Sequence, residues 1–259
     1  MGFLEDIVAQ TRGDVARRKM EHSLSDLLAR IDPPDRGRPF SEALIAPGVS
    51  LIAEMKRASP SKGPIRPDAD VTAIVQAYEI GGAAACSILT EPQFFGGSLD
   101  DLRAARAACS LPLLRKDFIV DCYQLAEARL AGADAALLIV AALEEDEFAE
   151  LLQFGGELGL DLLVEAHTED EVQVAVDGGA EIVGINNRNL KTLEVDPDTV
   201  LNLLADIPAG TVVVAESGIS ERSDVIRLGE AGVDAILVGE ALMREDDPVA
   251  AIRSLIGTT

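Results

Sequence analysis

Short apolar runs alternate with longer amphipathic stretches along most of this chain. From residue 50 onward the runs lie at 50–56, 81–90, 111–118, 131–140, 161–167, 177–187, 211–217 and 231–240. Few polar residues interrupt them, which is typical of parallel strands that are buried on both faces. The stretches between the runs have apolar residues at helical spacing, and several begin with Asp, Ser or Thr and end at Gly. The pattern therefore predicts eight strands that alternate with helices.

The expected helices lie at 71–82, 99–108, 123–132, 145–158, 169–179, 199–207 and 223–232. Four of the runs also share a Gly that is followed by small residues, and these glycines recur about every 50 residues, at Gly82, Gly132, Gly179 and Gly232. Eight such units favour an α/β fold of the closed (β/α)8 TIM-barrel type. An open doubly wound sheet is the alternative, but the first run lacks the Gly-x-Gly-x-x-Gly turn of that fold.

The segment before the first run is different in character. Residues 3–19 and 23–31 read as helices, and a Pro-rich link follows at 32–39. We therefore expect one domain over 1–259, made of an N-terminal helical extension (1–48) and the barrel (49–259).

Charge narrows the range of partners. The chain has 22 Lys and Arg against 45 Asp and Glu, a net charge of −23. Such a surface repels nucleic acid and anionic membranes, so neither is expected as a partner, and an anionic substrate needs a locally positive pocket. A saline cytoplasm would favour this composition because salt screens the self-repulsion. An acidic protein of an ordinary cytosol is the other interpretation.

Cysteine, histidine and hydropathy limit the class further. The three Cys are irregularly spaced, which indicates reduced thiols in the cytoplasm, and the two His argue against a zinc site. The N-terminus lacks the apolar core of a signal peptide, and no run of 18 apolar residues is present. We expect a cytoplasmic monomer without a metal.

Most of the predicted strands end in polar residues, and this is the end where the active sites of such barrels lie. They are Glu54 and Lys56, Lys116, Glu165, Asn186 and Arg188, Glu216 and Ser217, and Glu240. Side chains alternate along a strand, so Glu54 and Lys56 share one face. So many charges are costly to bury unless they pair with one another or bind a charged ligand. Ion pairs that merely satisfy one another are possible for any one strand, but the whole set favours a site.

Gly218 directly follows the seventh run, and Gly239 lies at the end of the eighth. Barrels often hold a phosphate group in these two loops, where glycine lets backbone N–H groups approach an anion. Glycine is also an ordinary turn residue, so this indication is weak by itself.

The strand ends resemble those of indole-3-glycerol-phosphate synthases. The resemblance rests on AEMKRASPSKG (53–63), LRKDFIVDCYQ (114–124), LVEAH (163–167), GINNRNLKTLEVD (184–196), AESGI (215–219) and LVGEALMR (237–244). These segments follow the order of the family and cover the whole barrel. The first two are the most specific, whereas AESGI and VGEALM recur among phosphosugar barrels.

The resemblance implies a carboxy-lyase of tryptophan biosynthesis. Its substrate would be 1-(2-carboxyphenylamino)-1-deoxyribulose 5-phosphate, and its products indole-3-glycerol phosphate, CO2 and water, with no cofactor or metal. The implied catalytic residues are Lys116, Glu165, Lys56, Glu54 and Asn186. The implied substrate-binding residues are Arg188, Ser59, Glu216, Ser217, Phe95, Phe118, Leu137 and Leu190. The phosphate would lie against Lys56, Ser59, Gly218, Gly239 and Glu240.

The residue types suit this chemistry. Ring closure needs an acid beside the ketone oxygen, and a Lys whose pKa is lowered by burial and by neighbouring cations would serve. We assign ring closure to Lys116 and the substrate carboxylate to Lys56, while the reverse division stays open.

Three other classes are disfavoured. A phosphoribosylanthranilate isomerase commonly uses a Cys at a strand end, and Cys86, Cys109 and Cys122 lie elsewhere. A barrel without catalysis would show gaps among the strand-end residues, and there are none. A metal site built on Glu54, Glu165 and Glu216 would compete with the two lysines.

Overall fold

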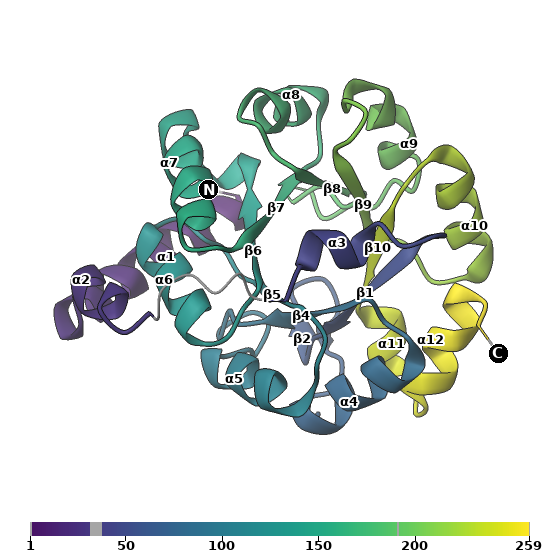
Figure 1. The fold of residues 1–259 in the computed structure, drawn as a ribbon, viewed down its shortest axis with the longest axis horizontal. Helices are drawn as coiled ribbons and strands as arrows, with labels where there is room; N and C mark the ends of the chain where they lie inside the picture. Colours follow the sequence, from purple (N-terminus) through teal and green to yellow (C-terminus); the bar gives the residue numbers. More distant parts are fainter. Residues whose placement is uncertain (1, 32–37, 191, 259) are drawn as a thin grey trace.

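A closed barrel of eight parallel strands forms the centre of the molecule (Figure 1). The computed structural model describes residues 2–31, 38–190 and 192–258. The strands are β1 (Ser50–Met55), β4 (Ala85–Leu89), β5 (Leu113–Lys116), β6 (Ala135–Ile139), β7 (Asp161–Ala166), β8 (Ile182–Asn186), β9 (Val212–Glu216) and β10 (Ala235–Val238). They pair in sequence order, and β10 closes the ring against β1. The predicted TIM barrel is confirmed.

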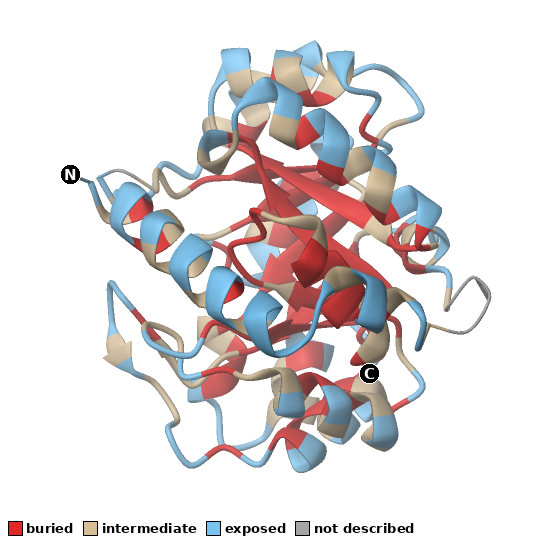
Figure 2. Cartoon of the chain, turned by 90° about the vertical axis from the view of Figure 1, so that its left-hand side faces the viewer, coloured by how far each residue is buried: buried red, intermediate tan, exposed pale blue. Residues whose placement is uncertain are grey.

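Helices surround the barrel and bury their apolar faces against it (Figure 2). They are α4 (Val71–Gly81), α5 (Leu99–Ala108), α6 (Cys122–Leu130), α7 (Glu145–Glu157), α8 (Glu169–Asp177), α9 (Thr199–Leu203), α10 (Arg222–Ala231), α11 (Glu240–Arg244) and α12 (Pro248–Ile256). The side chains of Asp70, Ser98, Asp121 and Thr168 cap helix N-termini as expected.

The repeated glycines mark the turn from a helix to the next strand. Gly82, Gly132, Gly179 and Gly232 all have positive φ, between 83° and 102°. Only glycine adopts this backbone conformation without strain. The sixth strand is shorter than its predicted run, because α8 continues to Asp177 and β8 begins at Ile182. The expected helix at 199–207 is α9 followed by a 3-10 turn, η2 (Leu204–Asp206).

One end of the barrel is closed by a short helix that the apolar pattern did not predict. This helix, α3 (Phe40–Leu44), lies in the middle of the ring of strands in Figure 1. Phe40 and Leu44 are fully buried and join the cluster of inward-facing strand residues. The backbone N–H of Ser41 donates to Asp161 at the start of β7. Because α3 fills the end where the strands begin, the described residues leave the other end, where the strands finish, for the entry of a substrate.

The N-terminal helices α1 (Phe3–Glu21) and α2 (Leu24–Leu28) pack on the outside of the barrel. Leu4 and Ile7 of α1 reach into the cluster of inward-facing residues. Ion pairs fix the rest of α1, including Arg12 with Glu147 at 2.8 Å. The expected Pro-rich link at 32–39 lies mostly outside the described residues. No helix in the described part of the chain is long and apolar enough to cross a membrane.

A two-stranded hairpin follows β1, made of β2 (Ala58–Ser59) and β3 (Gly63–Pro64). The two strands are antiparallel, with Ser59 opposite Gly63. Behind them, the N–H groups of Ile65 and Arg66 both donate to the carbonyl of Arg57, at 2.8 and 3.0 Å. The hairpin therefore has a fixed base, and its tip extends at the mouth of the barrel.

Candidate active site

A cavity of about 550 Å³ opens where the strands end. Every residue that the sequence analysis assigned to a site lines this cavity, so the structure brings the whole set together. The lining residues come from all eight strands of the barrel or from the loops that follow them, and β6 supplies only apolar side chains.

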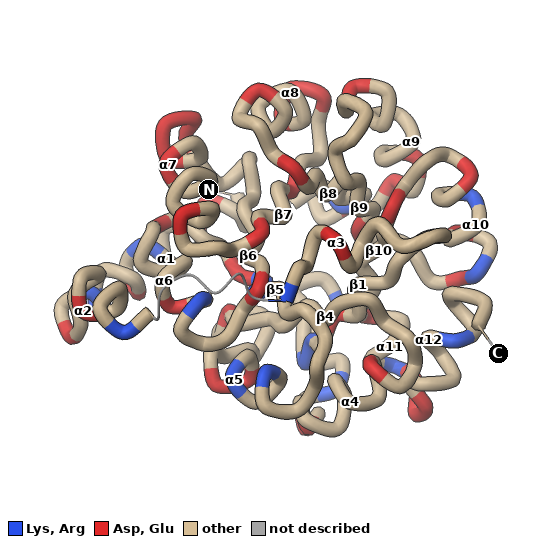
Figure 3. The backbone as a smooth tube through the Cα atoms, in the orientation of Figure 1, with Lys and Arg blue, Asp and Glu red and all other residues tan. Residues whose placement is uncertain are grey.

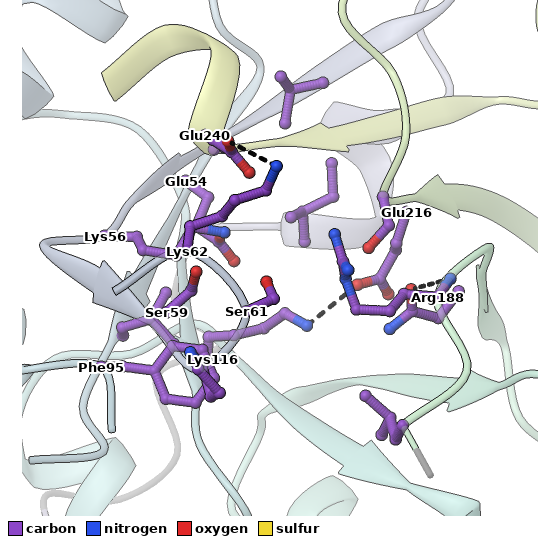
Figure 4. Close-up of a pocket in the computed structure, with 18 of the residues that line it drawn as sticks. Glu54, Lys56, Ser59, Ser61, Lys62, Phe95, Lys116, Arg188, Glu216 and Glu240 are labelled. Atoms are coloured by element: carbon purple, nitrogen blue, oxygen red, sulfur yellow. Dashed lines mark hydrogen bonds and ion pairs between the residues drawn. The ribbon is translucent and has the colours of Figure 1, made fainter. Parts of the chain in front are cut away.

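Lys116 lies at the centre of the charged part of the cavity. Its ammonium is 3.0 Å from Glu165 Oε2 and 3.0 Å from Glu216 Oε2. The amide of Asn186 donates to the other oxygen of Glu165 at 2.8 Å. Figure 4 shows the Lys116 side chain extended across the cavity toward Glu216. Side chains from four strands, β5, β7, β8 and β9, thus form one hydrogen-bonded group.

The expectation of a lowered pKa for Lys116 is wrong. Burial lowers this pKa, but the carboxylates of Glu165, Glu216 and Glu54 outweigh burial and raise it above the ordinary value. The expected neighbouring cations are in fact carboxylates. Lys116 is therefore an ammonium ion in the free protein and carries a proton that it can donate.

The pKa of Glu216 is also raised, and for a carboxyl group this shift favours the uncharged form. Burial, assisted by the charges of Glu165 and Glu54, raises its pKa to about 7, although Lys116 opposes the shift. Its Oε1 is buried and has no hydrogen-bond partner within the described residues. A carboxyl group that titrates near neutral pH inside a cavity is typical of a functional site.

A second ion pair lies at the end of β1. Lys56 Nζ is 2.6 Å from Glu54 Oε1, and both side chains are largely buried. Two glycines, Gly239 and Gly184, leave space for the carboxylates of Glu54 and Glu216 because they have no side chain. A Cβ atom at Gly239 would clash with Glu54 Oε1, and one at Gly184 would clash with Glu216 Oε1. Gly239 therefore has a steric role beside the phosphate-binding role implied for it.

Aromatic rings form an apolar part of the cavity wall. The ring centroids of Phe95 and Phe118 are 6.3 Å apart, and Leu137 and Leu190 continue the wall. The buried carboxylate of Glu91 holds the loop that carries Phe95. It accepts the backbone N–H groups of Gln93, Phe94 and Phe95 at 2.9, 2.7 and 3.0 Å.

The loops after β9 and β10 form the third part of the cavity. Ser217 and Gly218 both have positive φ, at 66° and 74°, and such a conformation is unusual for Ser. Ser59 of the hairpin also lines the cavity. Arg188 lies toward β8, where its guanidinium donates to the carbonyl of Leu193 at 2.9 Å.

Sequence reasoning missed Lys62, Arg244 and Phe3, which also line the cavity. Lys62 and Arg244 lie within segments quoted for the family resemblance, so their charge could have drawn attention to them. Phe3 is at the start of α1, and its ring packs edge-on against Phe94 with centroids 5.3 Å apart. No periodicity in the sequence predicts that contact.

The fold and the site define a (β/α)8-barrel enzyme with a lysine–carboxylate centre. The chain belongs to the indole-3-glycerol phosphate synthase family, whose model matches residues 4–255. It is 51% identical to the indole-3-glycerol phosphate synthase of Nocardioides sp. over 99% of both chains. It is 49% identical to that of Kineococcus radiotolerans, over 99% of this chain and 95% of the relative.

Solved structures of other barrels share the fold. A mutant tryptophan synthase α-subunit from Pyrococcus furiosus superposes with a TM-score of 0.62 at 19% identity, over 80% of this chain and 98% of that chain. At this identity the likeness supports the barrel architecture alone.

Proposed function

We propose that this chain performs the reaction of its family with Lys116 as the acid for ring closure. The substrate, 1-(2-carboxyphenylamino)-1-deoxyribulose 5-phosphate, offers a ring with a carboxylate, a ketone and a phosphate. The cavity has an apolar wall, a lysine–carboxylate centre and two glycine loops. The observation that carries the proposal is the Lys116 ammonium held between Glu165 and Glu216.

Ring closure forms a bond between the aromatic carbon that carries the carboxylate and the ketone carbon. Charge develops on the ketone oxygen, and Lys116 donates its proton there. The carboxylate then leaves as CO2, and its electron pair restores the aromatic ring. We assign to Lys56 the task of holding this carboxylate until it leaves.

Dehydration completes the indole. The new hydroxyl group leaves as water after it is protonated, and a ring proton must be removed. Glu165 is the acid/base group for this step, because Asn186 and Lys116 fix its two oxygens. Lys116 then takes up a proton from water, and the charges of Glu165, Glu216 and Glu54 favour its return to the ammonium form.

The remaining residues hold the substrate. Phe95, Phe118, Leu137 and Leu190 contact the anilino ring, and Arg188 and Ser217 orient the chain between the ring and the phosphate. The phosphate binds to backbone N–H groups at Gly218, Gly239 and Glu240, with Ser59 and Lys56 nearby. Glu240 contributes through its backbone, since its carboxylate would repel the anion. The working form we propose is a cytoplasmic monomer that needs no metal.

The test follows indole fluorescence after the substrate is mixed with the purified protein in EDTA. The wild-type protein should give a signal. Lys116→Met should lower kcat by about 10²- to 10⁴-fold, which is the usual contribution of a general acid. Lys56→Met should raise KM more than it lowers kcat. Lys19→Met, on the outside of α1, is the control with the same change of charge.

Each outcome has a clear meaning. No fluorescence from the wild-type protein, at low or at molar KCl, would overturn the proposed reaction. If Lys56→Met loses kcat and Lys116→Met mainly raises KM, the two lysines have the reverse roles. Far-UV circular dichroism of each variant checks that a loss of activity is not a loss of the fold.

A further inference from the structure

A carboxylate lies at the end of the cavity where the phosphate group is expected. Glu240 directly follows Gly239, and its side chain lines the cavity with 31% of its surface exposed. A phosphate dianion close to this group would be repelled. Two cations compensate it: Arg244 Nε is 3.1 Å from Glu240 Oε1, and Lys62 Nζ is 3.8 Å from the same oxygen.

Lys62 is held more loosely than the other lysines of the cavity. Lys116 and Lys56 have carboxylate oxygens within 3.0 and 2.6 Å. The 3.8 Å between Lys62 and Glu240 is too long for a hydrogen bond, and no other acceptor within the described segments is bonded to its ammonium. Its side chain is 48% exposed. The three N–H donors of Lys62 are thus available to an anion.

The hairpin brings this lysine to the phosphate end of the cavity. Lys62 lies between β2 and β3, and Ser59 of the same hairpin also lines the cavity. Figure 4 shows Lys62 reaching across the opening toward Glu240. Because the base of the hairpin is bonded to the carbonyl of Arg57, a short movement of the lysine side chain is enough to change its partner.

We propose that Lys62 is a phosphate-binding residue whose resting partner is Glu240. The phosphate monoester of the substrate draws the ammonium away from Glu240, while Arg244 continues to compensate the carboxylate. This inference rests on the proposed function and adds to it how the phosphate end of the cavity recognises its ligand.

A simpler role for Lys62 is to neutralise Glu240 without touching the phosphate. The two roles differ in the background of Glu240→Gln, where no carboxylate needs a counter-charge. If Lys62 binds the phosphate itself, its removal weakens phosphate binding in that background too. If it only neutralises Glu240, its removal has no effect there.

The experiment measures the dissociation constant of inorganic phosphate by ³¹P NMR, and KM in the fluorescence assay. Lys62→Ala should raise both by about tenfold, as expected for one charge-assisted hydrogen bond at a half-exposed site. Lys62→Ala should cause a loss of similar size when it is added to Glu240→Gln. Glu240→Gln alone should bind phosphate at least as tightly as the wild-type protein. Lys19→Ala, with the same loss of charge, should leave both constants within twofold.

Two results would overturn the inference. One is a phosphate dissociation constant for Lys62→Ala within twofold of the wild type. The other is a loss that disappears in the Glu240→Gln background, which would leave Lys62 a neutralising role only. Phosphate binding is measured without turnover, so a wild-type protein that binds phosphate and gives no indole fluorescence would count against the proposed reaction and not against Lys62.

Discussion

Replacing Glu216 by Gln should remove a pH dependence from the stability of the fold. In the folded protein burial raises the pKa of Glu216 from the ordinary 4.5 to about 7. The folded state therefore holds this proton between pH 4.5 and 7 while the unfolded chain releases it. Stability falls as pH rises through this window and levels off above it. Gln has nearly the same shape and does not titrate.

The size of the effect follows from the two pKa values. A pH unit corresponds to about 1.4 kcal/mol, so the interval from 4.5 to about 7 corresponds to about 3 kcal/mol. The free energy of unfolding of Glu216→Gln, relative to the wild type, should therefore increase by about 3 kcal/mol between pH 4.5 and pH 8. Titrating groups that do not interact with Glu216 are common to both proteins and cancel in the difference.

The assay is urea unfolding of the two proteins at pH 4.5, 5.5, 6.5, 7.5 and 8. Glu147→Gln is the control, because a hydrogen bond from Arg12 lowers the pKa of Glu147. The stability that Glu147 contributes is present above its unfolded pKa and is lost only in acid, so this variant should show no trend from pH 5.5 to 8. A difference for Glu216→Gln that stays within 0.5 kcal/mol across the series, roughly the resolution of such measurements, would refute a raised pKa for Glu216.

Three further predictions concern the cavity and the surface. Gly239→Ala should lower kcat/KM by at least about tenfold, because the new Cβ displaces the Glu54 carboxylate. Gly156→Ala in α7 is the control, because its new Cβ meets open space and should leave kcat/KM unchanged. Equal kcat/KM values for the two variants would contradict the steric role of Gly239. Glu91→Gln should raise KM by about tenfold and leave the phosphate dissociation constant unchanged, because only the loop that carries Phe95 is loosened. A parallel change in both constants would indicate that the substitution disturbs the whole cavity. The urea midpoint should rise from 0.1 to 1 M KCl as salt screens the acidic outer helices (Figure 3), and a midpoint that stays constant would contradict this.

The sequence was sufficient to predict the barrel and the members of the site because both depend on periodicity. Buried runs identify strands, and the end of each run identifies the residue that reaches the mouth. Contacts between side chains across the barrel cannot be predicted from this periodicity. Lys116 meets Glu165 and Glu216 because of the tilt of the strands and the size of the side chains, and neither is visible in a one-dimensional pattern.

Two other features could not be predicted from the sequence because they depend on which residues are close together in the folded chain. Gly184 reads as an ordinary strand residue until its missing Cβ is seen to leave space for the Glu216 carboxylate. The helix α3 has only five residues, too few to show a helical period, yet its own side chains Phe40 and Leu44 are fully buried. The division into an extension (1–48) and a barrel (49–259) within one domain stays a prediction.

The pairing of β10 with β1 has a consequence for the order of events during folding. Ala53 is in register with Val238, so Glu54 and Gly239 become neighbours only when the two ends of the sheet meet. Contacts between residues so distant in sequence form slowly, because the intervening chain must first be ordered. A refolding chain can therefore recover most of its secondary structure before the first strand and the last enclose the Glu54 carboxylate. The return of activity then reports the closing of the ring, and it should lag behind the return of the helices.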